Sequence, residues 1–118
     1  MSFVRIVPKS DDDPFPYDDA KRLLLIEDSD CIFEQADLRP MIEAGRRMGW
    51  PEALIRANEE LQQRGRCFKF EIQREPCLNG TLFEDNVMFE LSNSTSDEDA
   101  LREINRLATQ LNLKVFHH

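Results

Sequence analysis

Residues 67–73 read Cys-Phe-Lys-Phe-Glu-Ile-Gln, and residues 86–91 read Asn-Val-Met-Phe-Glu-Leu. Apolar and polar residues alternate in both segments, which is typical of strands that bury one face. Between the two segments lies Asn79-Gly80, a dipeptide that favours a two-residue type I′ hairpin turn. The sequence therefore predicts that the two strands are adjacent and antiparallel.

The turn also predicts the register of this hairpin. A two-residue turn at Asn79-Gly80 would place Phe70 opposite Phe89, and it would place Lys69 opposite Glu90 on the other face. A slip of one residue would set apolar faces against polar ones. The tip of the hairpin is expected to project beyond the sheet, where an apolar docking site would consist of Leu78, Leu82 and Phe83.

Periodicity and capping residues predict the remaining elements. A strand is expected at residues 3–7, helices at 38–48, 51–64 and 96–111, and a final strand at 113–116. Asp37 and Ser96 are good N-caps, and Gly65 suits the position after a helix. Residues 19–27 fit either a helix or a buried strand, and we expect a helix.

The order of these elements indicates an α+β protein. Two helices in one crossover layer give a β-α-β-β-α-β plan, which is ferredoxin-like: an antiparallel sheet with helices packed on one face. Residues 8–18 hold three prolines and four aspartates, so we expect an acidic loop inserted after the first strand. No linker or repeat interrupts residues 1–118, which predicts a single domain.

Charge and composition narrow the class of partner. The formal net charge is −8, which disfavours binding to nucleic acid or to an anionic membrane surface. Residues 1–37 have net −6, residues 38–74 net +3 and residues 75–118 net −5. No apolar run is long enough to span a bilayer or to serve as a signal peptide, so we expect a cytoplasmic protein.

The cysteines and histidines suggest neither a disulfide framework nor a metal centre. The chain has three cysteines, Cys31, Cys67 and Cys77, and none forms a CxxC pair. We interpret them as reduced thiols, with Cys67 on the outer face of a strand. His117 and His118 stand at the end of the sequence, and no two cysteines have ligand spacing.

The acidic loop contains the strongest candidate for a binding site. Its members are Asp11, Asp12, Asp13, Asp18 and Asp19. Carboxylates could hold a divalent cation, but the spacing does not fit an EF-hand loop. They could instead dock a basic protein partner, or they could simply be a solvated loop. The arginines of residues 38–66 likewise fit either solvated helix faces or an anion pocket.

These observations favour a non-catalytic protein-interaction domain, such as an inhibitor, an immunity-type protein or an adaptor. The sequence has no GxSxG, HExxH, P-loop or GxGxxG motif. We therefore expect no catalytic residues, no metal and no cofactor. The alternative hypothesis is a dimeric, ligand-binding regulatory domain that associates through a sheet edge or its hairpin. A small enzyme is the third hypothesis.

Overall fold

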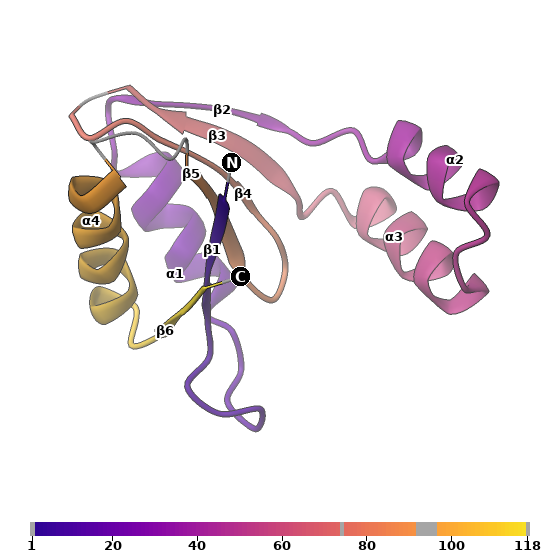
Figure 1. The fold of residues 1–118 in the computed structure, drawn as a ribbon, viewed down its shortest axis with the longest axis horizontal. Helices are drawn as coiled ribbons and strands as arrows, with labels where there is room; N and C mark the ends of the chain where they lie inside the picture. The colour runs from indigo at the N-terminus through magenta and orange to yellow at the C-terminus, as the bar shows by residue number, and fades with distance from the viewer. Residues whose placement is uncertain (1, 74, 92–96, 118) are drawn as a thin grey trace.

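The computed structural model describes residues 2–73, 75–91 and 97–117. It is a mixed α+β structure, as the sequence predicts, with a six-stranded sheet (Figure 1). In chain order the elements are β1 (Ser2–Val7), α1 (Tyr17–Lys21), its π-helical continuation η1 (Arg22–Ile26), β2 (Cys31–Gln35), α2 (Arg39–Arg47), α3 (Glu52–Arg64), β3 (Phe68–Ile72), β4 (Leu78–Leu82), β5 (Val87–Leu91), α4 (Asp97–Gln110) and β6 (Lys114–His117).

The predicted ferredoxin-like plan was wrong, because the observed strand order differs from it. The strands lie in the order β2-β3-β4-β5-β1-β6, and every neighbouring pair is antiparallel. Two of them, β2 and β4, were not expected from the sequence. Residues 8–16 form the loop between β1 and α1, and residues 17–26 are helical, which confirms the helix that we preferred there.

The predicted hairpin was also wrong, because a whole strand separates its two arms. Asn79 and Gly80 lie in the middle of β4, which pairs with β3 on one side and with β5 on the other. The tight turn lies instead at residues 84–85, where the Phe83 amide donates to the Asn86 carbonyl at 2.8 Å. Burial of the β4 leucines outweighs the local turn preference of Asn-Gly, because core contacts stabilise more than a turn propensity does.

Gly80 nevertheless lets the expected aromatic pair meet. It is the register partner of both Phe70 on β3 and Phe89 on β5. Because Gly80 has no side chain, the two rings touch across the intervening strand, edge to face, with centroids 5.7 Å apart and planes at 81°. A Cβ at position 80 would lie 2.4 Å from the Met88 carbonyl oxygen and 2.9 Å from Phe70 Cζ.

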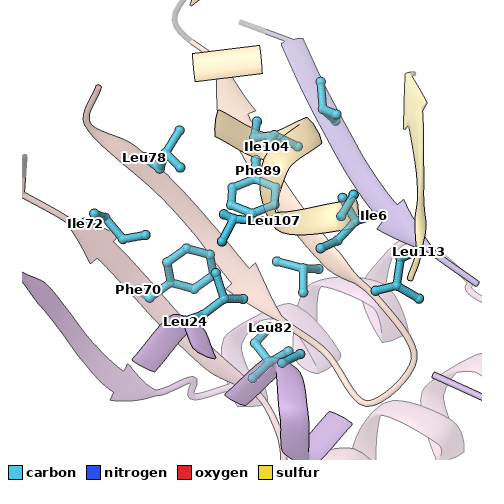
Figure 2. Close-up of a cluster of buried hydrophobic side chains, with 14 of the residues drawn as sticks. Ile6, Leu24, Phe70, Ile72, Leu78, Leu82, Phe89, Ile104, Leu107 and Leu113 are labelled. Atoms are coloured by element: carbon cyan, nitrogen blue, oxygen red, sulfur yellow. The ribbon is translucent and has the colours of Figure 1, made fainter. Parts of the chain in front are cut away.

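The main core fills the space between one face of the sheet and the helices α1, η1 and α4. Figure 2 shows Leu24 of η1 and Ile104 and Leu107 of α4 gathered with Phe70 and Phe89 of the sheet. We call this the inner face. Its strand residues alternate with exposed ones, which confirms the amphipathic patterns of β3 and β5.

The helices α2 and α3 do not share this core, so the expectation that the helices pack on one face was wrong for them. They form a helical hairpin between β2 and β3 that projects away from the sheet (Figure 1). We call it the helical arm. It has its own small cluster of buried residues: Ala36, Leu38, Ile42, Ile55 and Cys67. Gly65 ends α3 with φ +66°, as its predicted position requires. The predicted Ser96 cap lies outside the described residues.

The opposite, outer face of the sheet is open over its central strands. Lys69, Glu71, Asn79 and Glu90 all point to this face and are exposed. Within the described residues no helix covers these four side chains, and β2 lies at the edge of the sheet.

We expect Gly80→Ala to destabilise the fold by about 3 kcal/mol, at the upper end of the cost of overpacking. The added methyl group has no room between the Met88 carbonyl and the Phe70 ring. Urea denaturation measures the change. Asn79→Ala is the matched control, because Asn79 is exposed on the same strand, and its cost should stay within about 0.5 kcal/mol. Equal costs for the two variants would contradict the proximity of the aromatic rings to Gly80.

Candidate functional site

The aspartates of the loop between β1 and α1 are held on a fixed segment. The Lys9 ammonium donates to Asn112 Oδ1 at 2.9 Å, and Phe15 packs against the main core. Within the loop, the amide of Asp13 donates to the Ser10 carbonyl at 3.1 Å. The carboxylates of Asp11, Asp12 and Asp13 are therefore displayed from a loop that is anchored at both ends.

These three carboxylates have no cationic partner within the part of the chain that the structure describes. Asp18 and Asp19, by contrast, lie on α1 and form ion pairs with the protein's own arginines. Asp18 is 3.9 Å from Arg66, and Asp19 is 3.3 Å from Arg22. The structure thus divides the five predicted aspartates into an unpaired set, Asp11, Asp12 and Asp13, and a paired set, Asp18 and Asp19.

An open groove of about 570 Å³ runs beside the loop. Asp11, Asp13 and Asp85 contribute three carboxylates to its lining, and Arg5 and Lys114 contribute two cations. Its remaining lining residues are Val7, Pro8, Ser10, Phe15 and Phe116. The groove therefore joins carboxylates to aromatic rings, which is a combination that accepts guanidinium or ammonium groups.

The Arg5 side chain is already engaged within the protein. Its Nη1 donates to Asn86 Oδ1 at 3.2 Å, and Asn86 is buried. This contact holds the guanidinium against the turn between β4 and β5. Arg5 therefore has less freedom than an exposed arginine to swing toward the loop carboxylates.

The predicted apolar docking site at the hairpin tip does not exist as a surface. Leu78 and Leu82 belong to the main core and are 1% and 0% exposed. Phe83 is half-buried against the cluster of the helical arm. Because the predicted tip is a central strand, its leucines point to the inner face.

Two further grooves were not predicted from the sequence. One, of about 420 Å³, crosses β2 to β5 and is lined by acidic residues with one lysine: Glu34, Glu71, Glu90 and Lys69 among others. The alternation in β3 and β5 places Lys69, Glu71 and Glu90 on one face, but the position of Glu34 required the unexpected strand β2. The sequence alone could therefore locate three of these four residues on one face, but it could not locate Glu34.

The other groove, of about 520 Å³, lies between the helical arm and the turn after β4. Arg64 bridges it with two hydrogen bonds of 2.7 Å to the Glu84 carboxylate. Hydrogen bonding from Arg64 lowers the pKa of Glu84. The apolar lining comes from Met41, Trp50, Leu54, Leu61 and Phe83. Asn58 Nδ2, also in this lining, donates to the Leu54 carbonyl at 2.9 Å.

None of the three cysteines forms a disulfide in the described structure. Cys67 is buried at 1% exposure in the cluster of the arm, which corrects its predicted place on an outer face. Burial raises the pKa of the Cys67 thiol to about 11. The pKa of Cys77 is also raised, first by desolvation and then by Glu71 and Glu75. Neither thiol has the lowered pKa of a nucleophile.

The described residues contain no group of three or more His, Cys, Asp or Glu side chains arranged to hold a metal ion. No described helix has the length and apolar character needed to cross a bilayer. Comparisons with protein-family models, with curated proteins and with solved structures gave no match to this chain.

The thiols should react with Ellman's reagent in an order set by exposure. We expect Cys77 to react first and Cys67 only after unfolding, because Cys67 is buried and its pKa is raised to about 11. Cys77→Ser should remove the fast phase. A total of fewer than three thiols in denaturant would reveal a disulfide and contradict the structure.

Proposed function

We propose that this chain is a non-catalytic protein-interaction domain that docks a basic protein partner through its acidic loop. The observation that carries the proposal is the unpaired set, Asp11, Asp12 and Asp13. These carboxylates project from an anchored loop and have no counter-ion among the described residues, whereas Asp18 and Asp19 are paired internally.

Two physical effects favour this site for association. The anchored loop loses little conformational entropy when a partner orders it further. Clustered negative charge steers a basic partner toward the surface, so association is faster at low ionic strength. Both effects act without any enclosed pocket, which agrees with the open shape of the groove.

The groove beside the loop supports arginine or lysine as the recognised side chain. A guanidinium that enters it would reach the carboxylates of Asp11 and Asp13 and lie near the rings of Phe15 and Phe116. Charge-assisted hydrogen bonds and cation–π contacts both favour such a group. Apolar or acidic side chains gain neither interaction.

We expect Asp11→Asn/Asp13→Asn to weaken binding of an arginine-rich peptide by about tenfold at low salt, since a hydrogen bond to a charged group contributes about 1.5–3 kcal/mol and exposure to solvent reduces this. Titration of isotopically labelled protein, followed by amide chemical shifts, gives the affinity and the location together. The shifts should be largest in the loop, near Asp85 and near Phe116.

The matched control is Asp18→Asn/Asp19→Asn. Both double variants remove two negative charges from the net −8, so they differ only in where the charge is lost. The control should change the affinity by less than about twofold, because those carboxylates already pair with Arg66 and Arg22. Equal effects of the two double variants would mean that net charge alone drives binding, and the acidic loop would then not be the site.

A further inference from the structure

The edge strand β2 lacks the features that usually protect a sheet edge. It is first in the strand order, and no other strand among the described residues pairs with its free side. Ile32 is 57% exposed on the outer face, and the next residue, Phe33, is 44% exposed on the inner face. Edge strands are normally blunted by lysine, proline or a bulge. The sequence Cys-Ile-Phe-Glu-Gln has neither residue, and its five residues pair with β3 without an interruption in register.

The hydrogen bonds flanking β2 show which backbone groups face the free side. The Gln73 amide donates to the Asp30 carbonyl at 2.9 Å, and the Ala36 amide donates to the Cys67 carbonyl at 2.8 Å. Because bonded residues alternate in an antiparallel pair, Ile32 and Glu34 turn their backbone groups toward β3. Phe33 and Gln35 therefore turn their amides and carbonyls outward.

We propose that β2 pairs antiparallel with β2 of a second copy of this chain, about a two-fold axis at Phe33. The two Phe33 residues then exchange a pair of backbone hydrogen bonds, since both of their polar groups face outward. The two sheets become one continuous sheet. A two-fold contact of this kind is self-complementary and closed, so it gives a dimer and no fibre.

Side-chain contacts favour an axis at Phe33 over an axis one residue away in either direction. On the inner side the two Phe33 rings meet and extend the edge-to-face contact that Phe33 already makes with Phe68, whose centroid is 6.2 Å away. On the outer side Ile32 lies opposite Glu34 of the second copy. An axis at Glu34 would oppose two Glu34 carboxylates, and an axis at Ile32 would oppose Glu34 and Asp30. Like charges placed directly opposite one another are destabilising.

The dimer should respond to salt in the opposite sense to the acidic loop. Each copy has a net charge of −8, so salt screens the repulsion between copies and strengthens the pairing. A contact through five residues of one strand is small, which places the dimer in the weak, transient class. The proposal does not rest on the acidic loop, and either one can fail while the other stands.

Sedimentation equilibrium tests the pairing at high salt and its register at about 0.15 M salt, where charges directly opposite one another still lie within the Debye length of about 8 Å. Wild type should show a monomer–dimer equilibrium, and Ile32→Glu should raise the dissociation constant by about tenfold, because two like-charge pairs form by symmetry. Ile32→Lys should raise it far less, since the new ammonium faces Glu34 of the second copy. In the Ile32→Glu background, Glu34→Lys should restore dimerisation by placing opposite charges across the axis.

Position 32 is exposed, so these variants should fold, and circular dichroism checks this. Hydrogen exchange provides a second readout: the Phe33 and Gln35 amides should gain protection as the protein concentration rises. A wild-type protein that stays monomeric at high salt and high concentration overturns the proposal. Equal weakening by Ile32→Glu and Ile32→Lys, or no rescue by Glu34→Lys, overturns the register and with it this interface.

Discussion

The arrangement of the sheet depends on the contact of two phenylalanine rings across a glycine. Gly80 is in register with both Phe70 and Phe89, and the missing side chain leaves room for the rings to meet edge to face. This contact lets β4 occupy the centre of the sheet while β3 and β5 still share one core. The inner face so formed accommodates α1, η1 and α4, and the outer face stays open.

The position of the helical arm reflects how the buried apolar residues are divided between two clusters. Because α1, η1 and α4 fill the inner face, α2 and α3 bury their apolar residues in a cluster of their own. The bidentate contact between Arg64 and Glu84 ties this arm to the turn after β4. One consequence is that the neighbouring strand β2, which leads into the arm, remains an edge with exposed Ile32 and Phe33.

Folding neutralises part of the negative charge through ion pairs within the chain. Many carboxylates meet an arginine of the same chain, as Asp18 meets Arg66 and Glu84 meets Arg64. The aspartates at 11–13 meet no arginine in the described structure. An acidic sequence therefore becomes a specific surface only where folding leaves carboxylates without partners, and the aspartates at 11–13 are one such set.

The sequence by itself determined the elements whose signals are local. Alternation indicated β3 and β5, and Gly65 marked the end of α3. It could not place β4, because a glycine in mid-strand weakens the strand pattern, and it could not place β2, because an edge strand shows no alternation of burial. Only the tertiary structure decided the strand order, the partners of each carboxylate and the open edge, because these depend on contacts between residues far apart in the chain.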